Sequence, residues 1–142
     1  MTEFSVLVVD DEQEFRDITL KRLERRGLEV RGAESGEKAL EILEHNAVDV
    51  VVLDVKMQGL DGIETLRRIR KMKPLVEVVL LTGHASVDSG IEGMKLGAFD
   101  YLMKPIELES LLEKLTDAYE KKRIQQDKIE QAQIKRNMSK HA

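Results

Sequence analysis

The stretch VDVVVLDVKMQGLDG, residues 48–62, decides the fold of this chain. It opens with a run of β-branched residues, which is typical of a parallel strand buried on both faces. The run ends at Asp54, and a turn bracketed by Gly59 and Gly62 follows. Because burying an unpaired charge is costly, an acid at this position needs a reason. Open α/β sheets bind ligands at the carboxyl ends of their strands, so Asp54 is the first candidate for chemistry.

The composition fits one globular domain. The 142 residues are 42% hydrophobic and 35% charged and include no cysteine, so neither a disulfide nor a thiolate metal site can form. No apolar run approaches the ~20 residues of a membrane helix, and the amino terminus lacks the basic start of a signal peptide. We therefore expect a cytoplasmic protein with no membrane partner.

Charge is distributed unevenly along the chain. The net charge is −4, but residues 121–142 hold seven Lys or Arg against two acids, which leaves −9 on the first 120 residues. An acidic body argues against nucleic-acid binding by this domain. We expect residues 1–120 to form the domain and residues 121–142 to be a basic helical extension, a linker or a frayed tail.

Short apolar runs alternate with amphipathic segments along the whole domain. The expected strands are 5–9, 28–31, 48–54, 76–81 and 99–103, and helices are expected from Phe15 to Gly27, from Ser35, from Ile63, from Ser86 to Gly97 and from Glu107. This alternation predicts an α/β fold, a doubly wound sandwich in which helices cover both faces of a mostly parallel sheet. The strand at 28–31 is short and polar, so we expect it at an edge.

Polar side chains follow four of these strands. They are Asp10 and Asp11, then Asp54, Thr82 and Lys104. The carboxyl ends of parallel strands share one edge, so these groups are expected to converge in one cleft. Three clustered acids repel one another unless a cation lies among them, and their hard oxygen ligands suit Mg²⁺. Such a cation, an ammonium and a hydroxyl around one carboxylate would stabilise a phosphoryl group transferred to it.

Each of these features is common when taken alone. An acid pair often begins a helix, a Thr-Gly pair often forms a turn, and a Lys-Pro pair often ends an element. Their joint occurrence at successive strand ends favours a functional site over four unrelated structural details.

Four motifs occur in a fixed order: VVDDE at 8–12, LDVKMQGLDG at 53–62, LTGHAS at 81–86 and YLMKP at 101–105. Together they resemble the receiver domain of bacterial two-component response regulators, over about residues 4–120. The resemblance implies a flavodoxin-like (βα)5 sandwich with a five-stranded parallel sheet in the order 2-1-3-4-5. The residues of these motifs are most similar to those of receivers of the nitrogen-regulatory, enhancer-binding type, in which a helix connects the receiver to an ATPase domain.

The resemblance also implies chemistry. Asp54 would accept a phosphoryl group from a sensor histidine kinase or a phosphotransfer protein. Mg²⁺ would be bound directly by Asp11 and Asp54, by Asp10 largely through water, and by the backbone carbonyl of Lys56.

Further residues would carry the signal. Lys104 would pair with the phosphoryl group, and Thr82 would swing in to hydrogen-bond it. Tyr101 matches the switch aromatic of the family and would turn inward as Thr82 moves, and a purely structural half-buried ring on an edge strand is also a reasonable interpretation. Pro105 is expected to follow a cis peptide bond. The output surface would be helix four, strand five and helix five, which commonly forms homodimers in this family.

The chain departs from the family pattern at Gln58, where a proline is usual, and we expect altered loop dynamics there without loss of a ligand. Lys56 and His84 occupy positions that tune dephosphorylation in the family. Lys56 could contact the phosphoryl group or obstruct an attacking water, but most exposed lysines do neither, and His84 is expected to be a surface loop residue. The two residues therefore do not predict a phosphoryl lifetime.

Two other functions stay open. An aspartate-nucleophile phosphatase would need an acid two residues after Asp54, where this chain has Lys56. A phosphorylation-independent interaction module would be expected to lack Asp54, an acidic partner or Lys104, and all are present. No output domain follows in the sequence, so the chain is either a stand-alone receiver or one cut from a longer regulator.

Overall fold

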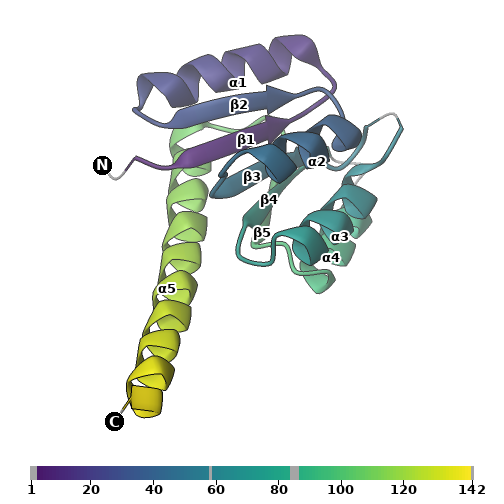
Figure 1. The fold of residues 1–142 in the computed structure, drawn as a ribbon. Helices are drawn as coiled ribbons and strands as arrows, with labels where there is room; N and C mark the ends of the chain where they lie inside the picture. Colours follow the sequence, from purple (N-terminus) through teal and green to yellow (C-terminus); the bar gives the residue numbers. More distant parts are fainter. Residues whose placement is uncertain (1–2, 58, 84–86, 142) are drawn as a thin grey trace.

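The computed structural model describes residues 3–57, 59–83 and 87–141. In this part of the chain five strands alternate with five helices (Figure 1). The strands are β1 (Ser5–Val9), β2 (Glu29–Ala33), β3 (Val50–Asp54), β4 (Glu77–Thr82) and β5 (Asp100–Met103). The helices are α1 (Gln13–Arg25), α2 (Gly36–His45), α3 (Gly62–Met72), α4 (Val87–Lys95) and α5 (Leu108–His141).

The strands form one parallel sheet in the order β2-β1-β3-β4-β5. This confirms the predicted doubly wound topology and the edge position of β2. That strand is shifted relative to the expected range 28–31 and continues to Ala33. The reason is pairing, because β2 follows β1 residue for residue from Ser5↔Glu29 to Val9↔Ala33.

Alternate residues of the central strands enter two separate cores. Leu7, Val51 and Leu80 belong to the core under α2, α3 and α4. Their neighbours Val8, Val52 and Val79 belong to the core under α1 and α5. Both faces of β1, β3 and β4 are therefore covered, which explains why these strands are apolar throughout instead of alternating with polar residues.

Capping residues begin two of the helices where the sequence suggests. Ser35 Oγ accepts a hydrogen bond from the Lys38 N–H at 3.1 Å, as expected for the start of α2. Asp61 Oδ1 accepts one from the Glu64 N–H at 2.8 Å and begins α3. Each such cap typically contributes about 1 kcal/mol. The cap expected from Ser86 at the start of α4 lies outside the described residues.

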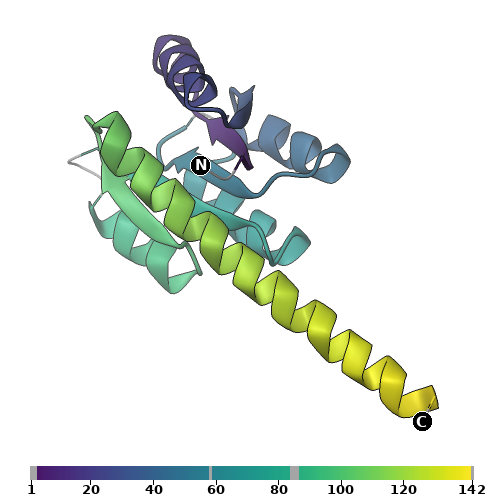
Figure 2. The same ribbon diagram turned by 90° about the vertical axis from the view of Figure 1, so that its left-hand side faces the viewer.

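Helix α5 runs on past the sheet as a single helix (Figure 2). Its last contacts with the body include a stacked pair of rings, Tyr119 on Phe4, with centroids 4.6 Å apart. Farther along, the apolar residues Ile124, Ile129, Ile134 and Met138 are 45–67% exposed. Neither α5 nor any other helix in the described part of the chain combines the length and apolar character needed to cross a membrane.

The helical spacing of Phe15, Ile18 and Leu23 predicts that all three lie on the apolar side of α1, but Ile18 does not pack into the core. Leu23 is fully buried, but Ile18 is 44% exposed. The sequence pattern does not separate the two because both are large aliphatic residues at helical spacing. Ile18 instead lines a surface groove next to Lys104.

Candidate functional site

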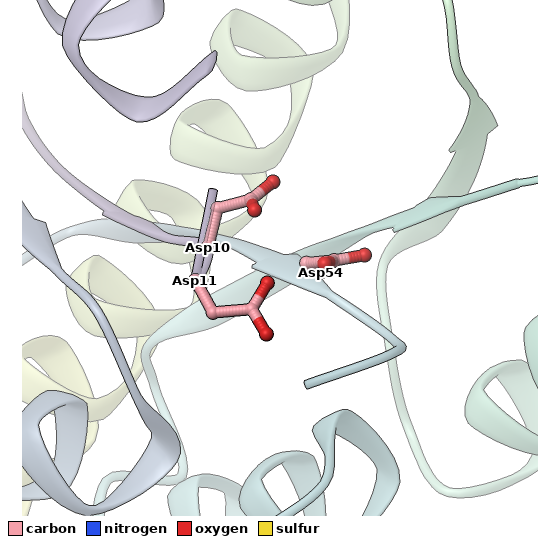
Figure 3. A group of neighbouring side chains, drawn as sticks. All are labelled: Asp10, Asp11 and Asp54. Carbon is pink, nitrogen blue, oxygen red and sulfur yellow. The ribbon is translucent and has the colours of Figure 1, made fainter. Parts of the chain in front are cut away.

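Three carboxylates meet at the carboxyl edge of the sheet. Asp10 and Asp11 directly follow β1, and Asp54 is the last residue of the neighbouring β3 (Figure 3). One ligand oxygen from each lies within 4.8 Å of the other two. Asp10 and Asp54 are buried and Asp11 is exposed. The predicted convergence of these acids is therefore present, and only one of them faces open solvent.

Asp10 is held by hydrogen bonds on both carboxylate oxygens. Its Oδ1 accepts the Glu12 N–H at 2.9 Å, and its Oδ2 accepts the Lys104 ammonium at 2.8 Å. Arg16 donates to the Asp10 backbone carbonyl at 2.7 Å. Because both of its oxygens already accept hydrogen bonds, the Asp10 carboxylate is oriented by the protein. It is better placed to accept a hydrogen bond from a water molecule on a cation than to bind the cation directly.

Lys104 is surrounded by acceptors and an aromatic face. Besides Asp10, its Nζ lies 3.6 Å from Glu12 and 4.0 Å from Asp54. The ring centroid of Phe15 is 4.2 Å away, within the range of a cation–π contact. Burial alone would lower the pKa of Lys104, but the hydrogen bond to Asp10 and the charge of Asp54 raise the pKa above its ordinary value. Lys104 therefore carries a firm positive charge at the centre of the site.

Asp54 has a perturbed acidity. Burial, and secondly the negative charge of Asp10, raise its pKa from 3.8 to about 6, while Lys104 and a hydrogen bond from the Lys56 backbone oppose the rise. The ionised carboxylate is thus held at a free-energy cost when no cation is bound. A cation or a phosphoryl group at this position relieves that cost, which is a chemical reason for an acid here.

Thr82 and Tyr101, the two residues expected to move on phosphorylation, lie on the strands β4 and β5. Thr82 is fully buried at the end of β4, and its hydroxyl lies 3.5 Å from the carbonyl of Leu102. Tyr101 is half-buried on the edge strand β5. Its ring packs against α4 at Gly90, where an added Cβ would come within 3.1 Å of the ring. Thr82 and Tyr101 therefore lie on the paired strands β4 and β5, with Tyr101 aligned with Leu80 and not with Thr82.

Other predicted positions are placed as follows. The Lys104–Pro105 peptide bond is cis, the geometry expected from the resemblance. Lys56 is exposed. Gln58 and His84 lie outside the described residues.

Sequence reasoning missed some of the residues that support the site. The sequence predicts Phe15 only as an apolar residue at the start of a helix, yet its ring covers the Lys104 ammonium. Arg16 and Glu12 bind Asp10 and Lys104 respectively. Because α1 begins immediately after the acid pair, its first turn has to face the site, and that proximity was the available signal.

A groove of about 430 Å³ adjoins Lys104 on the α1 side. Its lining is largely apolar and includes Phe15, Ile18, Pro105, Ile106, Leu108 and Leu111. The groove lies between α1 and the start of α5 and has Lys104 at one end, so a partner seated there would be next to the carboxylate cluster.

The donor set fits a hard divalent cation. It offers carboxylate oxygens and no sulfur or imidazole nitrogen among the described residues, with one acid exposed to solvent. Oxygen ligands with room for water are what Mg²⁺ prefers. The arrangement can hold a cation and a phosphoryl group together.

Comparison with known families agrees with this geometry. The sequence model of the "Response regulator receiver domain" family matches residues 6–116. The chain belongs to the response regulator receiver family. A solved receiver domain from Clostridium thermocellum is 38% identical, with a TM-score of 0.82, and the match covers 85% of this chain and 98% of that one.

Longer relatives contain the receiver as one part. An NtrX-like response regulator of Rickettsia conorii is 34% identical over 132 residues, which is 92% of this chain and 28% of the relative. The transcriptional regulatory protein ZraR of Escherichia coli is 39% identical over 106 residues, which is 75% of this chain and 24% of ZraR. This receiver therefore spans about a quarter of the length of the curated relatives it matches. These relatives are response regulators, which confirms the predicted resemblance to their receiver domains.

Proposed function

We propose that this receiver accepts a phosphoryl group on Asp54 from the phosphohistidine of a sensor histidine kinase or phosphotransfer protein. The observation that carries the proposal is the position of Asp54: a buried acid 4.0 Å from the Lys104 ammonium and within 4.8 Å of two further carboxylates. The Asp54 carboxylate would supply the oxygen for the new bond to phosphorus. The transfer breaks the N–P bond of the donor and forms an O–P bond on Asp54.

The metal in this proposal is Mg²⁺. Asp11 and Asp54 would bind it directly, with the backbone carbonyl of Lys56, and Asp10 would act mainly through water. The bound ion supplies charge neutralisation for the phosphoryl oxygens and for the clustered acids. The two hydrogen bonds that already occupy Asp10 support its indirect role.

The protein's own residues supply orientation. Asp54 is the nucleophile. Its raised pKa shows that the ionised carboxylate is destabilised by burial and by Asp10, so that a nearby positive charge would stabilise it. Lys104 would turn from Asp10 towards a phosphoryl oxygen and neutralise it. The Thr82 hydroxyl would donate a hydrogen bond to another oxygen, which requires a short movement of the end of β4.

Switching would be a shift in population between two conformations. In the switched conformation Thr82 and Tyr101 have moved, and the phosphoryl group interacts more favourably with the protein, so phosphorylation increases the population of this conformation. The output surface is α4, β5 and α5, and a homodimer through it is part of the proposal. Three large apolar side chains on α4 and β5 support this, because Ile91, Met94 and Met103 are 36–46% exposed.

The groove beside Lys104 supports a protein donor. An apolar surface next to the phosphoacceptor is suited to a helix of a partner protein, whereas a small phosphodonor needs no such surface. We propose that the donor protein docks there.

The division of the chain is also a proposal. Residues 1–120 would be the receiver, and 121–142 a helical connection to a further part of a regulator. ZraR is a transcriptional regulatory protein, so regulation of transcription is the proposed output. The chain would catalyse only its own phosphoryl transfer and dephosphorylation, because Lys56 stands where a phosphatase would need an acid.

Intact mass after incubation with acetyl phosphate and Mg²⁺ tests the proposal. The wild-type chain should gain one phosphoryl group that is stable in acid and labile in alkali. Asp54→Asn should gain none. If wild type fails under conditions that phosphorylate a reference receiver, and also with a phosphohistidine donor, a phosphorylation-independent module is the better description.

A further inference from the structure

A side chain from outside the site reaches into the loop that follows Asp54. Glu37, in the first turn of α2, accepts a hydrogen bond from the Leu60 backbone N–H at 2.7 Å through its Oε1. The two residues are 23 apart in sequence. Leu60 lies in the loop between β3 and α3, which also carries Lys56. A residue of α2 is therefore bonded directly to the loop that borders the carboxylate cluster.

The loop backbone also runs close to Glu37 at Gly59. Gly59 has a φ of +76°, and a Cβ built on it would lie 3.3 and 3.4 Å from the two carboxylate oxygens of Glu37. The backbone thus passes immediately beside the carboxylate. At its ends the loop is tied by the hydrogen bond from the Gly62 N–H to the Val55 carbonyl at 3.0 Å and by the cap formed by Asp61. Glu37 supplies a tie between these two ends.

The carboxylate is itself presented by a rigid platform. At Gly36 an added Cβ would come within 2.1 Å of Thr65 Oγ1 and 3.0 Å of the Leu60 carbonyl, so α2 packs directly against the loop and α3. Ser35 caps the same turn. The Glu37 carboxylate therefore reaches the Leu60 amide from a backbone that is held in place.

The loop matters to the site through Lys56. The Lys56 backbone N–H lies near the Asp54 carboxylate and acts to lower the pKa of that group. The carbonyl of the same residue is the proposed backbone ligand of the cation. The sequence of this loop, residues 55–61, contains no proline, whose ring would restrict a backbone φ angle. A side-chain hydrogen bond is another way to restrain such a loop.

We propose that Glu37 is a positioning residue of the phosphoacceptor site: its hydrogen bond to Leu60 holds the β3–α3 loop so that the Lys56 carbonyl faces the cation. The inference rests on the proposed function. It concerns the hydrogen bond and not the negative charge of Glu37, and a crossed pair of substitutions separates the two. Glu37→Gln keeps an acceptor of the same length and removes the charge. Glu37→Asp keeps the charge but is one methylene too short to reach Leu60.

The first measurement is Mg²⁺ binding to the unphosphorylated protein by titration calorimetry. Glu37→Asp and Glu37→Ala should bind Mg²⁺ about three- to tenfold more weakly, the loss expected for one hydrogen bond. Glu37→Gln should stay within about twofold of wild type. Glu41→Ala, which removes an exposed acid from the same helix, is the matched control and should equal wild type. Circular dichroism and urea unfolding identify any variant that fails to fold, and the Asp and Gln variants alone then decide.

The second measurement reads the contact without the metal. Exchange of the Leu60 amide hydrogen should be faster in Glu37→Asp than in wild type and unchanged in Glu37→Gln. Weak Mg²⁺ binding by Glu37→Gln with normal binding by Glu37→Asp would assign the effect to charge and overturn the proposal. Normal binding by both would overturn it as well. If wild type neither binds Mg²⁺ nor gains a phosphoryl group, the proposed function itself fails, whatever the exchange of Leu60 shows.

Discussion

The ammonium of Lys104 donates a 2.8 Å hydrogen bond to Oδ2 of Asp10, a carboxylate with no exposed surface. The same ammonium lies 4.0 Å from Asp54. Lys104 is therefore bonded to a neighbouring acid and not to the proposed phosphoacceptor. For Lys104 to neutralise a phosphoryl group on Asp54, it has to exchange or share its bond to Asp10. This exchange links the charge state of the site to the position of the loop that carries Lys104.

Removing the ammonium should strengthen cation binding. In Lys104→Gln the positive charge near the three carboxylates is lost, and the repulsion of a divalent ion falls by at least about 1–2 kcal/mol, the value for a charge a few ångströms away that is screened as strongly as in water. Mg²⁺ should bind roughly tenfold more tightly in titration calorimetry. Lys38→Gln removes a lysine that pairs with Glu41 on the surface of α2, and it should leave the affinity unchanged. Weaker Mg²⁺ binding by Lys104→Gln would contradict the assignment.

Asp54→Asn should stabilise the metal-free protein at neutral pH. The folded-state pKa of Asp54 is raised from 3.8 to about 6, so its protonated form contributes stability below pH 3.8 that is lost as the pH rises through about 6. Asn carries no charge to desolvate. The gain should be roughly 1–2 kcal/mol above pH 6, reduced from the full linkage value by nearby solvent.

Urea unfolding in EDTA at several pH values measures this gain. The advantage of Asp54→Asn should grow between about pH 4 and 6 and then stay constant. Asp17→Asn, an exposed acid on α1, provides the comparison. Adding Mg²⁺ should reduce the advantage because the ion stabilises only the wild-type carboxylate. A stabilisation that is independent of pH would rule out this explanation.

Thr82 should control the response to phosphorylation. Thr82→Val preserves the buried shape and removes the hydroxyl, so the phosphoryl group loses a hydrogen bond of about 1.5–3 kcal/mol in the switched state. The switched population relative to the resting one should fall at least tenfold. Amide chemical shifts of Tyr101 and α4, recorded with beryllium fluoride bound as a phosphoryl substitute, report it. Thr82→Ser should respond like wild type, and an equal response in Thr82→Val would show that the hydroxyl is not used.

The folded domain should extend two residues beyond the proposed division at residue 120, because Lys121 and Lys122 form ion pairs with its body. A chain ending at Asp127 keeps the Phe4–Tyr119 stack and the contacts of Lys121 with Glu77 and of Lys122 with Asp49. Its free energy of unfolding in urea should stay within about 0.5 kcal/mol of the full chain. A chain ending at Asp117 loses all three contacts and should be destabilised by about 3 kcal/mol or more. A large loss in the longer truncation would place the extension inside the folded unit.

The fold was predictable because its strands are buried on both faces. Runs such as Val50–Leu53 can be neither an exposed strand nor an amphipathic helix, and the alternation with helices then favours a parallel sheet. The limits of β2 were not predictable, because Gly32 and Ala33 join the strand through pairing with β1 and not through their own preferences. The exposure of Ile18 was missed for a similar reason. Periodicity shows which residues share one face of a helix, but not how much of that face packs against the sheet.

The sequence by itself determined which groups could perform the chemistry. The candidate groups lie at the end of a strand or directly after it, and parallel strands have to bring their carboxyl ends to one edge. These groups are Asp10, Asp11, Asp54, Thr82 and Lys104. Only the tertiary structure decided how these groups pair. That Lys104 is bonded to Asp10, that Phe15 covers it and that Glu37 holds Leu60 depend on contacts between elements distant in sequence. Such contacts are set by the packing of whole helices against the sheet, and no local pattern encodes them.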